Sequence, residues 1–493
     1  MGEPGSRGRE PRLVACVDFG STFTKAALVE VPTGELVATA AHRTTVDTDV
    51  LDGWDACRDE LVRADPRAAD AEVLACSSAG GGLRIGVVGN EELVTAEAGR
   101  RVALSSGGRV VHVASGGPGG GLDADGITAL HQSAPDVLLL VGGTDGGNAE
   151  VLLASARALA AAAWPGPVVV AGNVEARDGV SRILEAAGTP HVLADNVVPQ
   201  IGVLTPDSAR AAIREMFLVH VIGGKHLSRR ESSGSGPGSA FTAMVRGATP
   251  DVVLTGVELL ARGLDEEHPG AGDVVVVDVG GATTDVHSVV GVDPEDAGLA
   301  REVVASVPLA RTVEGDLGMR WSAVDAVEQG LAAGVLPEGE AASLREAARV
   351  RRADPSMLPT TARQHADDRM IATAAVGVAL RRHAGRQRVV FDTDPSTGSG
   401  RPGRLVERTG KDLREVDLLV GSGGVLRACG DALASEVIGS VTGRDVPGGW
   451  QLPEAPAVVV DRDYVLAPAG LLAATHPQAA FRLLRRITCA AWG

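Results

Sequence analysis

The chain alternates short apolar runs with longer stretches of helical periodicity over most of its 493 residues. Strands separated by helices are typical of parallel crossover units, so this pattern predicts an α/β fold. In the first half, the apolar runs lie at residues 72–76, 109–114, 136–141, 167–171 and 191–194.

Helices are predicted where apolar residues recur with helical spacing, and Asn148 is placed to cap the first of them. These helices span residues 148–164, 207–223, 323–333 and 363–384. Two segments rich in small residues, 228–239 and 393–403, predict mobile loops between the helices and strands.

Two segments far apart in the chain share one pattern: an apolar strand that ends in aspartate, a turn of glycine and hydroxyl residues, and a second apolar strand. The first covers residues 17–25 (VDFGSTFTK) and the second residues 277–285 (VDVGGATTD). Because a second strand follows each turn, the pattern predicts β-hairpins and not strand-to-helix loops. No internal repeat is visible beyond these two hairpins.

The turns of both hairpins suit phosphate oxygens, because glycines let backbone N–H groups approach closely and the neighbouring hydroxyls are further donors. We expect the two turns to clasp one nucleotide from opposite sides. Lys25 would add a positive charge if its stem bends toward the phosphates; the alternative is a solvent-facing strand residue. The expected phosphate-binding residues are Gly20, Ser21, Thr22, Lys25, Gly280, Gly281, Thr283 and Thr284.

The aspartates distinguish a nucleotide site from an ordinary turn. A carboxylate beside a polyphosphate is repelled unless a cation lies between them, and Mg²⁺ prefers oxygen ligands and retained waters. Asp18 and Asp278 are therefore expected to hold Mg²⁺ through water. Asp285 is expected to join them as a catalytic residue, with Asp278 or Asp285 positioning the attacking water or taking its proton. The alternative, that Asp-x-Gly only closes a β-turn, is less consistent with two copies in one chain.

A third glycine-rich element covers residues 418–426 (LLVGSGGVL), where an apolar strand meets glycines and then a helix. Such a turn can lie flat against an adenosine ring. The candidate adenosine-binding residues are Gly421, Ser422, Gly423 and Gly424.

Together and in this order, the three elements resemble the superfamily of actin, sugar kinases and heat-shock chaperone ATPases. Within it, residues 140–148, 312–318 and 410–413 are similar to the glutamate mutase accessory family called MutL or GlmL. Residues 458–472 would be the strand-to-helix connector that closes the second domain. The resemblance covers nearly the whole chain and implies an α/β fold of two actin-like (ribonuclease H-like) ATPase domains flanking a nucleotide cleft.

On this resemblance, residues 1–12 are a disordered tail, 13–250 a first domain with the first hairpin, 251–475 a second domain with the second hairpin and the adenosine loop, and 476–493 a C-terminal helix. It also implies slow, Mg²⁺-dependent ATP hydrolysis and a partner, the subunits of adenosylcobalamin-dependent glutamate mutase. The alternatives are a hydantoinase or oxoprolinase type of ATP-dependent amidohydrolase, a small-molecule kinase, and a non-hydrolysing filament or scaffold protein.

The composition of the chain argues against some classes of binding partner. Asp and Glu number 63 against 46 Lys and Arg, and this net charge of −17 opposes general nucleic-acid binding. The five cysteines lack metal-type spacing and predict buried thiols in a reducing compartment. No apolar run is long enough to predict a membrane span. We therefore expect a cytoplasmic protein with no membrane or nucleic-acid partner, and the sequence leaves its oligomeric state open.

Overall fold

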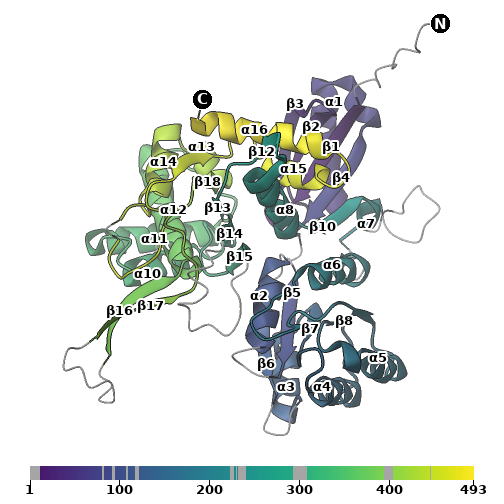
Figure 1. Ribbon diagram of the computed structural model, residues 1–493. Helices are drawn as coiled ribbons and strands as arrows, with labels where there is room; N and C mark the ends of the chain where they lie inside the picture. Colours follow the sequence, from purple (N-terminus) through teal and green to yellow (C-terminus); the bar gives the residue numbers. More distant parts are fainter. Residues whose placement is uncertain are drawn as a thin grey trace, which may run out of the picture.

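The computed structural model describes residues 12–79, 83–90, 95–106, 109–116, 121–222, 227–228, 230, 240–291, 308–392, 403–444 and 446–492. Within these ranges the chain forms three five-stranded sheets with helices packed against them (Figure 1). The predicted N-terminal tail and most of the predicted loops at 228–239 and 393–403 lie outside the described residues.

The first sheet contains the first hairpin and has the strand order β10-β4-β1-β2-β3. Strands β1, β2 and β3 form an antiparallel meander, whereas β4 and β10 run parallel to β1 on its other side. The strands span β1 (Arg12–Phe19), β2 (Phe23–Val31), β3 (Glu35–Arg43), β4 (Glu72–Ser77) and β10 (Val245–Ala248).

Strand β1 is buried on both faces of the sheet. Val17 packs in one core with helix α1 (Val50–Ala64), while Cys16 packs in another with helices α8 (Thr249–Arg262) and α15 (Leu466–Leu472). Successive side chains of a strand point to opposite faces. A strand covered on both sides is therefore apolar at nearly every position, which explains the continuous apolar run in the sequence.

The second mixed sheet has the order β15-β14-β13-β18-β19 and repeats the topology of the first. Its first three strands form an antiparallel meander, and two parallel strands follow on the other side of β13. The structural repeat therefore extends over five strands, although the sequence indicates it only at the hairpins. The strands span β13 (Val274–Val279), β14 (Thr284–Val289), β15 (Leu309–Glu314), β18 (Leu418–Ser422) and β19 (Ala457–Val460).

Helices α10 (Ala323–Ala332), α11 (Ala341–Ala353) and α12 (Ala362–His383) pack together in a core over one face of this sheet. Two of them match the predicted helices at 323–333 and 363–384. Helix α12 begins at a capping box in which Thr361 and Gln364 satisfy each other's backbone N–H groups.

The third sheet is parallel throughout and has the order β6-β5-β7-β8-β9. It lies between β4 and β10 in the sequence, so it is an insertion in the first sheet. Four of the five predicted crossover strands belong to it, whereas the run at 72–76 is β4. The strands span β5 (Arg84–Gly89), β6 (Arg109–Ser115), β7 (Val137–Leu140), β8 (Val168–Val170) and β9 (His191–Leu193).

Five helices accompany the third sheet. Ala149, not the predicted Asn148, is the N-cap residue of one of them, α4. Asn148 lies one residue earlier, and its side chain accepts a hydrogen bond from the N–H of Glu150, the first residue of that helix, at 3.0 Å. The helices span α2 (Glu97–Ser105), α3 (Ala124–Ser133), α4 (Glu150–Ala161), α5 (Arg177–Ala186) and α6 (Asp207–Met216). The remaining elements named in Figure 1 are α7 (Ala240–Met244), β12 (His268–Pro269), β16 (Arg386–Asp392), β17 (Gly403–Thr409), α13 (Gly424–Ala428), α14 (Asp431–Gly439) and α16 (Pro477–Trp492).

Helices α8, α15 and α16 lie between the two mixed sheets and form one core with both (Figure 1). Val14 of β1 and Val276 of β13 belong to this same core. The predicted α/β fold with two related halves is thus confirmed, and the two halves are joined through shared apolar packing. None of the helices in the described ranges is both long and apolar enough to cross a bilayer.

Two glycines allow α8 and α15 to cross closely. A Cβ on Gly470 would lie 1.9 Å from the carbonyl oxygen of Val252, and a Cβ on Gly256 would lie 2.3 Å from that of Leu466. Both distances are far below van der Waals contact, so any other residue forces the two helices apart.

We expect Gly470→Ala to lower the free energy of unfolding by about 1–3 kcal/mol, because its methyl group overpacks the crossing. Urea denaturation followed by circular dichroism measures the change. Gly439→Ala is the matched control, since no atom lies within 4 Å of the added Cβ. Equal stabilities of the two variants would contradict the close crossing.

Candidate functional site

The two hairpin turns have the same internal geometry. The N–H of Gly20 donates to the carbonyl oxygen of Phe23 at 3.1 Å, and the N–H of Gly280 donates to that of Thr283 at 2.9 Å. A Cβ at Gly20 or Gly280 would lie 2.6 or 2.8 Å from the same carbonyl oxygen. Both turns therefore require glycine at this position, and the antiparallel pairing on either side confirms the predicted hairpins.

The tips of the two turns meet. A Cβ on Gly281 would lie only 3.1 Å from the hydroxyl oxygen of Thr22, which belongs to the other hairpin. That hydroxyl oxygen is buried and has no hydrogen-bond partner among the described residues. Leaving a buried polar group unpaired costs free energy. The Thr22 hydroxyl is therefore an unsatisfied polar group at the contact between the two turns.

The other predicted phosphate-binding hydroxyls differ in their surroundings. Ser21 is exposed beside the first turn and Thr283 is half-buried in the second. Thr284 is buried, and its hydroxyl donates to the carbonyl oxygen of Leu317, so it supports the neighbouring turn.

Asp18 lies behind the first turn and is only 4% exposed. The Thr249 hydroxyl donates to its Oδ1 at 2.6 Å, and the Tyr464 hydroxyl donates to its Oδ2 at 2.8 Å. Thr249 begins α8, and Tyr464 lies just before α15. The carboxylate of the first hairpin is therefore held by both segments that join the two mixed sheets.

Asp278 occupies the matching position of the second hairpin. Burial raises the pKa of Asp278 to about 6; the positive charge of Lys25 opposes this shift, and the negative charges of Asp285 and Asp18 add to it. A hydrogen bond with Ser422 lowers the pKa of Asp278. Lys25 and Asp18 belong to the first hairpin and Ser422 to the third glycine element, so groups from all three elements act on Asp278.

Asp285 ends the second turn and forms an ion pair that the sequence pattern did not reveal. Nη2 of Arg311 donates to Oδ1 of Asp285 at 2.9 Å. Arg311 lies on β15, is 3% exposed, and its Nε and Nη1 have no hydrogen-bond partner among the described residues. The signal available in the sequence was a single arginine between the apolar residues of this strand.

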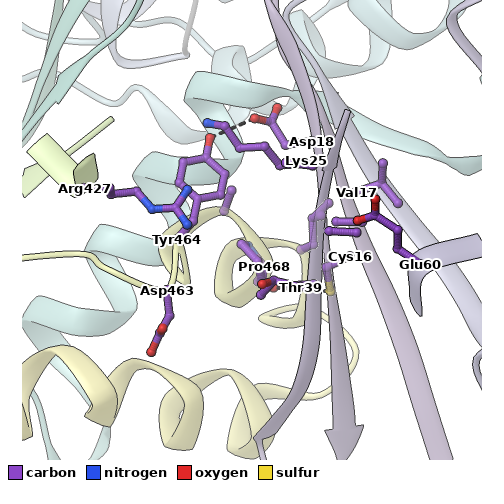
Figure 2. Close-up of a pocket in the computed structure, with 16 residues that line it drawn as sticks. Cys16, Val17, Asp18, Lys25, Thr39, Glu60, Arg427, Asp463, Tyr464 and Pro468 are labelled. Atoms are coloured by element: carbon purple, nitrogen blue, oxygen red, sulfur yellow. Dashed lines mark hydrogen bonds between the residues drawn. The ribbon is translucent and has the colours of Figure 1, made fainter. Parts of the chain in front are cut away.

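Lys25 packs on an aromatic ring and does not extend into solvent. Its Nζ lies 3.6 Å from the ring centroid of Tyr464, the only tyrosine in the chain. Figure 2 shows Lys25, Tyr464 and Asp18 together, with Arg427 beyond the ring. These four residues help to line a cavity of about 160 Å³. Sequence reasoning missed Tyr464, although its uniqueness in the chain was visible.

The third glycine element has the predicted order of strand, glycines and helix, in β18 and α13. A Cβ on Gly421 would lie 2.1 Å from Cδ1 of Ile438, and one on Gly423 would lie 2.2 Å from the carbonyl oxygen of Val279. Packing thus accounts for both glycines. Gly424 has no atom within 4 Å of an added Cβ and faces open space.

A charged cluster lies at the end of β15 beside the second hairpin turn, where Glu314 pairs with Thr284. Nη1 of Arg382 contacts the carboxylates of Glu314 and Asp316 at 2.6 and 2.7 Å. Arg109, from the third sheet, shares with these two acids the lining of a cavity of about 410 Å³. The stretch at 312–318 therefore borders the third sheet as well as the second hairpin.

Two facing hairpins on topologically equivalent mixed sheets define a protein with the actin-like ATPase fold. Within that class, the chain belongs to the MutL protein family, whose model matches residues 14–488. Protein MutL of Clostridium tetanomorphum is 34% identical over 481 residues, which cover 95% of this chain and 98% of the relative.

Two solved structures align with most of the chain at low similarity. Nucleotide-free acetone carboxylase aligns with a TM-score of 0.39 and 15% identity, covering 94% of this chain and 70% of its own. The activator of 2-hydroxyisocaproyl-CoA dehydratase from Clostridium difficile, with bound ADPNP, aligns with a TM-score of 0.28 and 9% identity, covering 96% and 95%. These scores are too low to support conclusions about function.

Asp278→Asn should stabilise the folded protein at pH 8. The native pKa of Asp278, about 6, exceeds its unfolded value of 3.8, so the aspartate destabilises the native state once pH rises through 6. Asparagine removes that charge, and we expect a gain of about 2 kcal/mol at pH 8 that shrinks as pH falls from 6 toward 4. Urea denaturation at a series of pH values measures it.

Asp65→Asn is a control of opposite sign, because hydrogen bonds from Arg67 lower the pKa of Asp65. That variant should lose stability at pH 8 relative to pH 4. A difference between wild type and Asp278→Asn that does not vary with pH would show that Asp278 is not electrostatically strained.

Proposed function

We propose that this protein binds ATP with Mg²⁺ between its two hairpin turns, hydrolyses it slowly, and serves adenosylcobalamin-dependent glutamate mutase as an accessory protein. The observation that carries the ATP site is the contact between the two turns, where Gly281 faces the Thr22 hydroxyl. The charges of Lys25 and Asp18 on the first hairpin also act on Asp278 of the second. The mutase as partner rests on membership of the MutL family. In this role the protein helps to exchange or protect the cofactor of the mutase.

The turn residues fit phosphate oxygens. The unpaired, buried hydroxyl of Thr22 is a donor at the meeting point of the turns. Gly20 and Gly280 keep side chains out of the turns, so that backbone N–H groups can approach the phosphates. Gly424, which faces open space at the start of α13, is the residue of the third element best suited to an adenosine ring.

The carboxylates fit Mg²⁺, which prefers oxygen ligands and retains several waters. Asp18 and Asp278 supply oxygens from the two hairpins and would hold the ion through its waters. When bound, Mg²⁺ neutralises charge on the phosphate oxygens. In the described ranges no group of three or more His, Cys, Asp or Glu side chains is positioned to hold a metal ion.

Asp278 is the preferred proton acceptor for the attacking water. A general base is most effective when its pKa lies close to the working pH, and the pKa of Asp278 is raised to about 6. Asp285 is engaged by the buried guanidinium of Arg311. It would therefore orient the water and not take its proton.

Hydrolysis would loosen the clasp and change the angle between the two mixed sheets. The third sheet is tied to this movement, because Nε of Arg214 on α6 donates to Oδ2 of Asp251 at 2.6 Å. Asp251 lies in the first turn of α8 and is 2% exposed. A change at the nucleotide would thus reach the third sheet through α8, and a partner bound there would respond to it.

Asp278→Asn should lower the rate of ATP hydrolysis roughly a hundredfold, the effect typical of losing a general base. Phosphate release measured with and without Mg²⁺ tests this. Asp273→Asn is the matched control at the other end of the same strand and should hydrolyse ATP like the wild type. If Asp278→Asn retains the full rate, the residue belongs to turn structure only.

Inactivated glutamate mutase, incubated with intact adenosylcobalamin, should recover activity only when this protein and hydrolysable ATP are both present. The reason is linkage: if the partner prefers one arrangement of the sheets, nucleotide and partner alter each other's affinity. The folded Asp278→Asn variant should not restore activity. Recovery without ATP would leave a passive holding role, and a phosphorylated or hydrolysed metabolite would favour a kinase or an amidohydrolase.

A further inference from the structure

We propose that Tyr464 is a positioning residue that holds Asp18 and Lys25 in a nucleotide-free arrangement and links their release by Mg²⁺ and nucleotide to movement of helix α15. The inference rests on the proposed function and deepens it, since it assigns a regulating contact to the same site.

The side chain of Tyr464 contacts both Asp18 and Lys25, the two charged residues proposed to bind Mg²⁺ and phosphate. The Tyr464 hydroxyl donates to Oδ2 of Asp18 at 2.8 Å, while its ring lies 3.6 Å from Nζ of Lys25 (Figure 2). Asp18 is the proposed oxygen donor toward Mg²⁺, and Lys25 is the proposed cation toward phosphate. A hydroxyl donor and a metal ion compete for the same lone pairs of a carboxylate. A phosphate that drew Nζ of Lys25 away from the ring would likewise break its contact with Tyr464.

The turn that carries Tyr464 is held by hydrogen bonds to its backbone. The carboxylate of Asp461 accepts the N–H groups of Val465 and Leu466 at 2.9 and 3.2 Å, which caps the start of α15. Tyr464 itself has a φ of 56°, in the left-handed region that residues other than glycine seldom adopt. Such a conformation persists only when its surroundings hold it. The ring therefore leaves Lys25 most easily when the whole turn moves with it.

The same turn is fastened to the third glycine element. Nε of Arg427 on α13 donates to the carbonyl oxygen of Arg462 at 2.8 Å, and Nη1 of Arg462 donates to the carbonyl oxygens of Arg427 and Cys429 at 2.6 and 2.7 Å. The guanidinium of Arg427 also lies 5.7 Å from the Tyr464 ring centroid. Residues 461–464 thus connect the adenosine loop, the first hairpin and α15.

Movement of this turn would be transmitted to both mixed sheets. Helix α15 belongs to the core that contains β1 and β13, and it crosses α8 at Gly470 with no space for a side chain. A shift at the start of α15 therefore alters the packing between the sheets. Nucleotide binding at Asp18 and Lys25 would in this way change the packing of α8 and α15 between the two mixed sheets.

Tyr464→Phe separates the proposed role from simple packing. Phenylalanine keeps the ring beneath Lys25 and removes only the hydroxyl on Asp18. Loss of that donor leaves a buried carboxylate that Mg²⁺ can compensate. We expect the Kd for ADPNP with Mg²⁺, measured by isothermal titration calorimetry on the full chain, to fall about tenfold. A residue that only packs would leave this Kd unchanged or raise it.

Hydrogen exchange of residues 461–472 provides the second readout. In the wild type, exchange in this segment should rise when ADPNP and Mg²⁺ bind. In Tyr464→Phe it should already be raised without nucleotide and change little on binding. Arg486→Gln is the control, because it breaks the 2.6 Å ion pair with Asp463 in the same turn and leaves Asp18 untouched; its Kd should equal that of the wild type.

The outcomes distinguish this inference from the function on which it rests. If the wild type does not bind ADPNP with Mg²⁺, the proposed function fails and the inference fails with it. If the wild type binds, and Tyr464→Phe shows the wild-type Kd and wild-type exchange, the proposed function stands and the role of Tyr464 is refuted. A similar fall in Kd for Arg486→Gln would also refute it, since the effect would then come from loosening the turn.

Discussion

Helices α8 and α15 cross so closely that backbone lies against backbone at Gly256 and Gly470, and the rest of the site depends on this contact. Because both helices share one core with both mixed sheets, the crossing fixes how the sheets face each other. It thereby brings the two hairpin turns tip to tip. Helix α8 and the turn before α15 carry the two hydroxyls, from Thr249 and Tyr464, that hold Asp18.

The site concentrates negative charge in a buried place, which is unfavourable without compensation. Asp18, Asp278 and Asp285 lie close enough for the charges of the other two to raise the pKa of Asp278. Arg311 forms an ion pair with Asp285. The hydroxyls of Thr249 and Tyr464 donate to Asp18, and Lys25 lies over the ring of Tyr464. Residual strain of this kind, in a core otherwise built from apolar side chains, is typical of sites that bind a cation or carry out acid–base chemistry.

The third sheet is an additional part of the protein beside the two related halves. It is inserted between β4 and β10 and shares a core with the first half, in which Val87 of β5 and Val17 of β1 both lie. The ion pair between Arg214 and Asp251 also connects it to α8. The third sheet approaches the second half as well, because Arg109 borders the cavity beside Glu314 and Asp316. Because the third sheet and its helices contact both halves, a change in the angle between the halves would affect them. A partner bound to the third sheet would therefore respond to whether nucleotide is bound or hydrolysed.

The sequence by itself determined the local features of the protein. Short-range patterns predict the glycine turns, the hairpins around them and four of the five inserted parallel strands. Turn geometry and strand periodicity involve residues close in the chain. The resemblance to the actin-like ATPase superfamily and to the MutL family further predicted the two-domain arrangement and the family of the protein. Tertiary structure alone decided that the repeat spans five strands, that packing requires Gly421 and Gly423, and that Arg311 engages Asp285. It also decided that Tyr464 reaches Asp18 across 446 positions of the chain; no periodicity encodes such a contact, because it exists only once two helices pack between two sheets.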